Sequence, residues 1–200
     1  MARPKVKIAR ALGIPLTSKA ARIMERRPSL PGQHGQGRKR SPSVFKTQLI
    51  EKQRLKAIYN VSEKQLHKYY EKANRSEDNS GDVLLGLLET RVDSAIYRMG
   101  FASTIYAARQ FVSHGHFEIN GKQTRTPSQQ LKPGVMVSVK EKSKTHPQII
   151  EALTHSQNIQ VPEYLEINKV QMSGKLISFP LRGQIPVELN EQLVIELYSK

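Results

Sequence analysis

The chain of 200 residues contains no cysteine. This absence excludes disulfide bonds, zinc sites with thiolate ligands and cysteine-bound iron–sulfur clusters, and it is compatible with a reducing compartment. No apolar run is long enough to cross a membrane, and no segment has the apolar centre and small-residue cleavage site of a signal peptide. With 38% apolar residues, the chain can bury a modest core in one or two domains.

Acidic residues are scarce in the first third of the chain. Residues 1–75 hold 19 Lys/Arg and 4 Asp/Glu, a net charge of +15, whereas residues 76–200 hold 13 of each. This asymmetry indicates a polyanionic partner, most often a nucleic acid. An anionic membrane surface is the competing partner, but it favours a basic helix with a strongly apolar opposite face. The first 45 residues have no such face, so we expect no membrane partner.

The N-terminal region is a basic arm with prolines, glycines and too few apolar residues for a core of its own. One interpretation is a disordered, solubilising tail. We prefer an arm that orders against RNA, whose phosphates neutralise its charge and release counterions. The glycines of segment 31–37 let backbone amides approach a phosphate closely, although the Gly-Lys-Ser/Thr ending of a P-loop is absent. The RNA-binding candidates here are Arg3, Lys5, Lys7, Gly32, Gln33, His34, Gly35, Arg38, Lys39 and Arg40, and the arm also carries Arg10, Arg22, Arg26 and Arg27.

Apolar spacing predicts helices between residues 45 and 72. Ser62 followed by Gln65 is typical of a capping box that opens the second of them. Three tyrosines offer rings for stacking on RNA bases, but tyrosines at helical spacing are more often core residues, and we prefer that role for Tyr59, Tyr69 and Tyr70. The cations taken as RNA-binding candidates in this segment are Lys52, Arg54 and Lys56.

Residues 88–139 carry the clearest local pattern, two helices followed by a hairpin. Leu88, Val92, Ala95, Ile96 and Met99 recur at three- and four-residue spacing, which predicts one amphipathic helix. Glycine at 100 ends it, Ser103 or Thr104 caps the next helix, and glycine at 115 ends that one. The dipeptide at 120–121, Asn-Gly, predicts a tight turn between two strands.

Polar residues of this segment suggest a binding surface. Arg91 and Arg98 are seven residues apart, which predicts that they lie on nearly one line of the first helix. Residues 91–144 hold nine Lys/Arg and three Asp/Glu, a net charge of +6. A small α/β core with a solvated basic face is one interpretation, and a preformed surface for a phosphate backbone is the one we prefer. The RNA-binding candidates here are Arg91, Arg98, Arg109, Gln110, Ser113, His114, His116, Asn120, Gly121 and Lys122.

Several motifs match a known family. L-E-T-R-V-D at Leu88–Asp93, Y-R-M-G-F-A-S at Tyr97–Ser103, A-A-R-Q-F-V-S-H-G-H at Ala107–His116 and I-N-G-K at Ile119–Lys122 match the RNA-binding module named after ribosomal protein four of the small subunit. P-G-Q-H-G-Q-G-R-K-R, Q-L-I-E-K-Q-R-L-K-A-I-Y, V-P-E-Y-L-E-I and I-P-V-E-L-N-E-Q-L-V-I-E-L-Y-S-K extend the match over nearly the whole chain. The sequence thus resembles the cysteine-free branch of the ribosomal protein four family, so the metal site of many members is not expected here.

The resemblance implies an α+β fold with a mainly helical first domain that the C-terminal tail completes. A small α/β RNA-binding domain of two helices and a short antiparallel sheet is inserted between them. The expected divisions are the arm 1–45, a helical domain 46–90 with 160–200 packing back onto it, the inserted module 91–150 and the tail 151–200. Residues 145–200 carry a net charge of −2, a poor RNA surface that suits packing or a protein neighbour. Short strands are expected at 175–179 and 185–187.

The resemblance also implies a function. It implies a structural constituent of the small ribosomal subunit, which binds rRNA early at a multi-helix junction and nucleates assembly of the subunit body. It further implies contact with ribosomal protein five, a contribution to translational accuracy, and a place near the mRNA entry region. We expect a cytoplasmic ribosome, with an organellar ribosome left open, and no homo-oligomer. The alternatives are an RNA-modifying enzyme or a ribosome-associated chaperone that carries the same module.

Catalytic and metal sites find little support in the sequence. His114 and His116 are close together, but no cysteine or nearby carboxylate completes a metal set. No nucleophile elbow or Ser/His/Asp arrangement can be assigned. Asp93 lies among arginines, where it more simply orients Arg91 or Arg98 than reacts. We therefore expect no catalytic residue, no metal and no cofactor.

Overall fold

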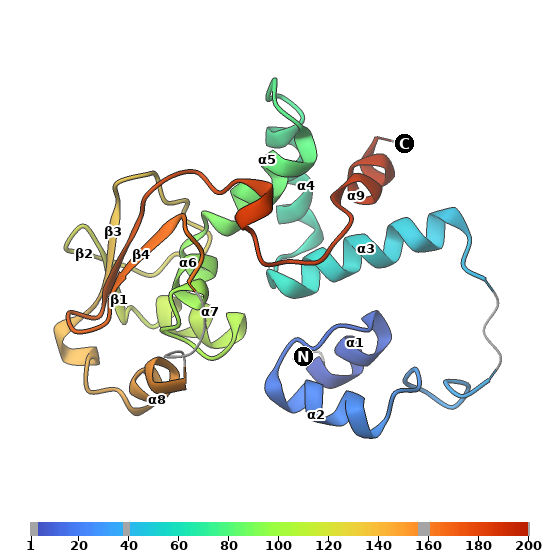
Figure 1. Ribbon diagram of the computed structural model, residues 1–200, viewed down its shortest axis with the longest axis horizontal. Coiled ribbons are helices and arrows are strands. Elements are labelled where there is room, and N and C mark those ends of the chain that lie inside the picture. Colours follow the sequence, from blue (N-terminus) through green and yellow to red (C-terminus); the bar gives the residue numbers. More distant parts are fainter. Residues whose placement is uncertain (1–3, 38–40, 156–160, 200) are drawn as a thin grey trace. The chain divides into compact units, whose positions relative to one another are not determined.

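A computed structural model of the chain describes residues 4–37, 41–155 and 161–199 (Figure 1). Within these ranges it contains nine α-helices and a five-stranded antiparallel sheet, which confirms the α+β class. The chain divides into two compact units, Met1–Lys68 with Leu189–Lys200 and Tyr69–Glu188. We call these the first and second units. In the part of the chain described, no helix combines the length and apolarity needed to cross a membrane.

The first unit begins with two short helices, α1 (Lys5–Leu12) and α2 (Ser18–Arg26), which pack against each other. Thr17 caps α2 by accepting a hydrogen bond from the Ala20 amide at 3.1 Å. Each helix buries one alanine completely, Ala9 on α1 and Ala20 on α2. Few apolar side chains are buried here, as expected, but small alanine side chains let two helices approach closely without a large apolar core.

Three further stretches of helix complete the first unit: α3 (Val44–Ile58), the beginning of α4 (Glu63–Ala73), and α9 (Glu191–Tyr198). The predicted capping box opens α4, since Ser62 and Gln65 each accept a hydrogen bond from the other's backbone amide. Gln48 on α3 donates to Glu196 on α9 at 2.9 Å. The C-terminal segment Leu189–Lys200 belongs to this unit.

The second unit packs helices against the sheet. Its helices are the end of α4, then α5 (Ser80–Glu89), α6 (Val92–Arg98), α7 (Ile105–Ser113) and α8 (Pro147–His155), with 3-10 turns η1 (Glu141–Ser143) and η3 (Arg182–Gln184). The strands are β1 (Phe117–Ile119), β2 (Lys122–Thr124), β3 (Met136–Val139), β4 (Leu165–Asn168) and β5 (Ser173–Leu176), in the order β2-β1-β3-β5-β4. The tail therefore supplies two strands of the sheet. β5 overlaps the strand expected at 175–179, whereas the segment expected as a strand at 185–187 is not one.

Local sequence signals place the α6–α7–hairpin segment correctly. Gly100 and Gly115 follow the two helices with φ of 78° and 76°, and Thr104 caps α7 by accepting from the Ala107 amide. Asn120 and Gly121 have φ of 47° and 77°, as a two-residue hairpin turn requires. β1 then pairs with both β2 and β3. These predictions are confirmed.

The prediction of one helix through residues 88–99 is wrong. The helix breaks between α5 and α6, where Arg91 has extended dihedral angles and forms a β-bridge with Gln130. The amide of Val92 donates to the carbonyl of Gln129 at 2.9 Å, and that of Leu131 donates to Thr90 at 2.8 Å. Backbone pairing with a distant segment thus replaces the helical bonds that the spacing alone predicts.

Apolar side chains from α6, α7, the sheet and α8 form the core of the second unit. Phe101 and Phe117 are fully buried within it, with ring centroids 5.9 Å apart. Tyr59 and Tyr69 are buried at 2% and 8% exposure, and Tyr70 is half-buried. The preference for core roles over base stacking is therefore confirmed for Tyr59 and Tyr69.

Candidate RNA interface

Polar residues from α7 and the β1–β2 hairpin form one exposed surface on the second unit. We call it the α7–hairpin face, and its exposed members are Gln110, Ser113, His114, Asn120, Gly121, Lys122 and Arg125. The end of α7 is tied to β2, because Gln123 Nε2 donates to the Gly115 carbonyl at 2.8 Å. A Cβ at Gly115 would overlap Gln123. The tip of the hairpin is tied to β3, since Asn120 Oδ1 accepts from the Met136 amide at 3.0 Å.

Arg109 lies at the border of the α7–hairpin face. Its side chain is 35% exposed, and one guanidinium nitrogen is 3.9 Å from Asp93 Oδ2. The Ser113 hydroxyl donates to the Arg109 carbonyl at 2.9 Å, which fixes Ser113 along the helix. The face therefore presents its polar groups on a helix and a hairpin that are both anchored, a geometry suited to recognising a fixed arrangement of phosphates.

Arg91 does not lie on this face, contrary to the prediction. Its side chain and that of Asp93 are both fully buried, and they form a two-pronged ion pair with distances of 2.9 and 2.7 Å. A third guanidinium nitrogen donates to the Tyr69 hydroxyl at 2.8 Å. Burial alone would lower the pKa of Arg91, but the hydrogen bonds and charge of Asp93 raise it overall. Arg91 is therefore a core residue, and the interpretation that Asp93 orients it is confirmed.

Arg98 is also engaged inside the second unit. It donates to the buried Glu89 carboxylate at 2.6 and 3.0 Å, and its side chain is only 14% exposed. Tyr164 donates to the same carboxylate at 3.0 Å, so Glu89 links α6 to the start of β4. Burial and the Glu89 charge raise the pKa of the Tyr164 hydroxyl. In the described part of this unit, Arg91 and Arg98 therefore do not lie along one line of a helix. Neither of them is a free surface cation.

The cations predicted on α3 are paired with acids of the first unit. Lys52 and Lys56 bind Glu63 at 2.8 and 2.7 Å. Partial burial alone would raise the pKa of Glu63, but hydrogen bonds from these lysines and Tyr198 lower it to about 2. These residues join α3, α4 and α9, so we do not retain the lysines in the proposed RNA surface.

Arg54 likewise has internal partners. Its guanidinium binds Glu51 at 2.6 Å and donates through Nε to the Leu12 carbonyl at 2.8 Å. The second bond accounts for part of the packing of α1 onto α3. Glu51 in turn accepts from the Asn190 amide at 3.3 Å, so the same cluster reaches the start of α9.

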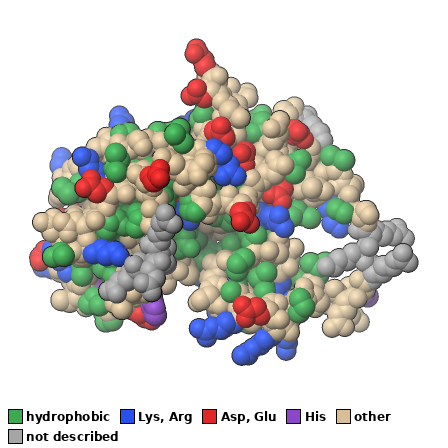
Figure 2. All heavy atoms as spheres, in the orientation of Figure 1, with side chains coloured by type: hydrophobic (Ala, Val, Ile, Leu, Met, Phe, Trp, Pro, Cys, Tyr) green, Lys and Arg blue, Asp and Glu red, His purple; other side chains and the backbone are tan. Residues whose placement is uncertain are grey.

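The arm presents part of its predicted charge. Lys5 and Lys7 on α1 are exposed, as are Gly32, Gln33 and His34 in the loop. The predicted phosphate contacts through loop amides do not fit Gly35 and Gly37, whose amides donate to carbonyls of Gly32 and His34. Figure 2 shows Lys and Arg side chains gathered over α2, whereas acidic side chains mark the turn between α4 and α5. Four further candidates, Arg3, Arg38, Lys39 and Arg40, lie outside the described residues.

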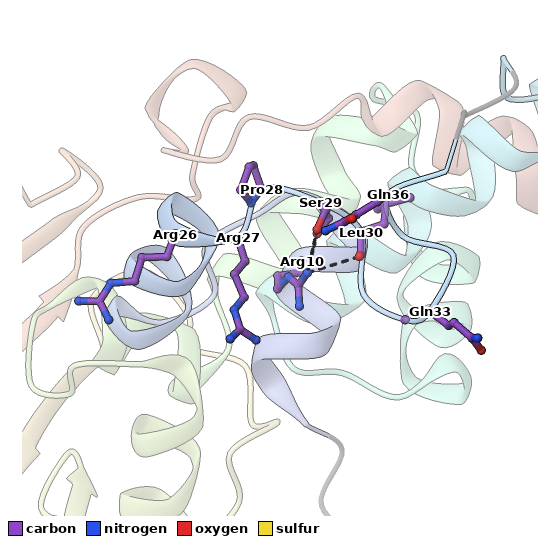
Figure 3. A pocket seen from close by; sticks show the side chains of 9 residues that line it. Arg10, Arg26, Arg27, Pro28, Ser29, Leu30, Gln33 and Gln36 are labelled. Carbon is purple, nitrogen blue, oxygen red and sulfur yellow. Dashed lines mark hydrogen bonds between the residues drawn. The ribbon is translucent and has the colours of Figure 1, made fainter.

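A pocket in the first unit groups residues that the sequence patterns do not bring together (Figure 3). It has a volume of about 620 Å³ and is lined by Arg10, Arg26, Arg27, Pro28, Ser29, Leu30, Gly32, Gln33 and Gln36. Arg10 donates to the Ser29 carbonyl at 2.8 Å and more weakly to the Leu30 carbonyl at 3.4 Å. Arg10 is separated from this loop by 19 and 20 residues, so only the folded α1–α2 pair creates the pocket.

His114 of the α7–hairpin face has two neighbouring histidines, His116 and His146. His114 is exposed, whereas His116 is half-buried with Nδ1 2.9 Å from the Ser143 hydroxyl. The rings of His116 and His146 are 5.2 Å apart. Burial and the neighbouring His146 and His114 lower the pKa of His116, which favours the neutral ring. Within ranges 4–37, 41–155 and 161–199, no group of three His, Asp or Glu side chains could hold a metal ion.

Comparison with known proteins identifies the family. Residues 1–89 match the family model described as ribosomal protein S4/S9 N-terminal domain, and residues 90–137 match the S4 domain. The chain is 46% identical to small ribosomal subunit protein uS4 of Granulibacter bethesdensis over 100% of this chain and 98% of the relative. It is 44% identical to uS4 of Streptomyces avermitilis over 99% and 98%. It is 42% identical to uS4 of Chlorobium phaeovibrioides over 97% and 96%. The chain therefore belongs to the small ribosomal subunit protein uS4 family.

Proposed function

We propose that this protein is a structural, non-catalytic constituent of the small ribosomal subunit and binds the rRNA of that subunit. The observation that carries the proposal is the likeness, over nearly the whole chain, to proteins named small ribosomal subunit protein uS4. The S4 domain match falls on the segment that bears the α7–hairpin face. The excess of positive charge in residues 1–75 supports a polyanionic partner.

The proposed mechanism is recognition of RNA shape and phosphates. Double-stranded RNA hides most of its base edges in a deep, narrow groove, so proteins recognise its shape, phosphates and 2′-hydroxyls. The α7–hairpin face offers the exposed cations Lys122 and Arg125 together with amide and hydroxyl groups. Lys5 and Lys7 of α1 supply further cations from the first unit. Such a set neutralises phosphates without chemistry, and its affinity falls as salt rises.

The finer role that we propose follows the family resemblance. The protein binds early at a multi-helix junction of the rRNA and holds the junction while the subunit body assembles. It contacts ribosomal protein five, contributes with it to translational accuracy, and lies near the mRNA entry region of the cytoplasmic ribosome. Co-sedimentation tests the constituent role, because a constituent is present at one copy in each mature small subunit whereas an assembly chaperone is absent from it.

A paired comparison of variants tests the RNA surface. Lys122→Ala combined with Arg125→Ala removes two exposed cations from the α7–hairpin face, and Lys169→Ala with Lys175→Ala removes two exposed cations elsewhere in the same unit. We expect the first pair to weaken binding to small-subunit rRNA and to reduce the slope of log affinity against log salt by about two. Equal losses from both pairs, or none from the first, would show that this face does not bind rRNA.

Incubation of the protein with rRNA, followed by analysis for altered bases, tests the enzymatic alternative. We expect no modified base, whether or not a small-molecule donor of a transferable group is added. A modified base that depends on the protein would overturn the structural role, whatever the affinity measurements show.

A further inference from the structure

The α1–α2 pocket is a built cavity with a polar, cationic lining. Its volume of about 620 Å³ lies within the range of about 300–1,000 Å³ typical of small-molecule sites. Three of its nine lining residues are arginines and none is acidic. Pro28 and Leu30 add apolar surface, and Ser29 and Gln36 add hydrogen-bonding groups. A lining of this kind fits a ligand that has both an anionic part and a flat, polar part.

The arginines of this pocket differ in their engagement. Arg10 is fixed by the Ser29 and Leu30 carbonyls, as the dashed lines in Figure 3 show. Its Nε is buried and has no hydrogen-bond partner among the described residues. A buried donor without an acceptor costs free energy, and because this atom is enclosed by protein, Arg10 adds to the cavity mainly its positive charge. Arg26 and Arg27 are exposed and make no ion pair with a described acidic residue.

The loop that forms the opposite wall is shaped before any ligand is present. Gly35 donates to the Gly32 carbonyl, and a Cβ at Gly35 would overlap the Leu30 carbonyl. Arg10 binds that same carbonyl, so the loop and α1 constrain each other. In Figure 3 the side chains of Arg26 and Arg27 point in different directions, and Gln33 points away from Arg10. Two separate cationic groups are therefore available around one cavity.

We propose that this pocket receives a single unpaired nucleotide of the RNA to which the chain binds, an inference that rests on the proposed function. The base enters the cavity and stacks on the planar guanidinium of Arg27, as unstacked bases do on arginine planes in RNA complexes. Arg26 binds the adjoining phosphate at the rim. A nucleotide satisfies both parts of the lining, whereas a simple phosphate uses only the cations.

Substitution of Arg27 by lysine distinguishes a nucleotide whose base stacks on the side chain from a simple phosphate. Arg27→Lys keeps the charge but removes the planar surface, and Arg27→Ala removes both. Arg22→Lys and Arg22→Ala are matched controls, because Arg22 is exposed on α2 and does not line the pocket. The probe is small-subunit rRNA, with affinity measured at several salt concentrations on the full chain. Since base stacking on a side chain contributes roughly a tenfold change or more, we expect Arg27→Lys to weaken binding about tenfold.

Base-specific chemical probing of the bound rRNA gives a second readout. We expect one unpaired nucleotide to be protected by the wild-type chain and by both Arg22 variants, and to become reactive with either Arg27 variant while the rest of the footprint persists. Arg27→Lys binding like wild type, with the footprint unchanged, would overturn the nucleotide pocket. Loss of the whole footprint at once would overturn it too, because the effect would not be local. A wild-type chain that fails to bind rRNA would instead refute the proposed function.

Discussion

Removal of the Arg91 side chain should destabilise the second unit rather than weaken RNA binding directly. Arg91→Ala would leave the Asp93 carboxylate at 0% exposure with the Ser94 amide at 3.0 Å and Arg109 at 3.9 Å as its remaining partners. It would also remove the 2.8 Å bond to the Tyr69 hydroxyl. Breaking one partner of a buried ion pair costs about 3–5 kcal/mol. That is a large share of the roughly 5–15 kcal/mol by which a typical domain is stable.

Urea unfolding followed by circular dichroism measures this cost. Thermal unfolding gives a second measure, since for a chain of this size a loss of about 4 kcal/mol lowers the midpoint temperature by roughly 8–16 °C. The double variant Arg91→Met with Asp93→Leu should recover much of the loss, because apolar residues of similar volume leave no uncompensated charge. The exposed Arg125→Ala is the control, and it should unfold like the wild type.

The outcome distinguishes a core residue from an RNA ligand. If Arg91→Ala unfolds at the wild-type urea concentration while its rRNA affinity falls, the side chain contacts RNA. In that case the ion pair with Asp93 does not stabilise the fold. If the double variant is as unstable as the single one, an unpaired charge is not the cause. Removing Arg91, Arg98 and Arg109 together would break three ion pairs within the second unit, so a loss of RNA affinity in that variant would not show that these side chains contact RNA.

Two further predictions concern the first unit. Glu63 has a pKa of about 2 in the folded protein against an ordinary 4.5. The ionised carboxylate therefore stabilises the fold above pH 4.5, and this contribution is lost as the pH falls towards 2. Because the Glu63 side chain is 45% exposed, the contribution is only about 1 kcal/mol. Glu63→Gln should lower the urea midpoint at pH 7 and flatten the plot of unfolding free energy against pH between pH 4.5 and 2. If that plot runs parallel to the plot for the exposed control Glu77→Gln, the reasoning is wrong. Gly35→Ala should destabilise the loop by about 1–3 kcal/mol, because its Cβ overlaps the Leu30 carbonyl. In Gly37→Ala the nearest atom is 3.4 Å away, so matching urea midpoints for the two variants would refute the reasoning.

Signals that act over a few residues predicted much of the second unit. The Asn120–Gly121 turn needs positive φ at both positions, and few residue pairs other than Asn-Gly supply this. Thr104 offers a hydroxyl to a free amide at the start of α7, which is a strictly local interaction. Because these preferences do not depend on distant contacts, they can be read directly from the order of the residues.

Contacts between distant segments determine the features that the sequence patterns did not predict. Arg91 leaves the helical pattern because its backbone pairs with Gln130, and its side chain then meets Tyr69 from α4. The tail could be recognised as apolar, but nothing local specifies that β5 pairs with β3 rather than with the first unit. Similarly, Arg10 belongs to a pocket only because α1 and α2 pack together. Such partners are 19 or more residues away and leave no periodicity that marks them.

In the second unit, arginines pair with two buried carboxylates whereas Lys122 lies in solvent, and both placements have a physical cause. The arginine guanidinium is planar and offers a fixed fork of donors, so it suits buried carboxylates such as Asp93 and Glu89. The lysine ammonium is strongly hydrated and remains better accommodated in water, as Lys122 is on the hairpin. A count of charge along the sequence therefore overstates the number of cations that can meet phosphates, because each buried acid withdraws an arginine from the surface. What identifies the binding surface is the set of cations left exposed after the core has formed its own ion pairs.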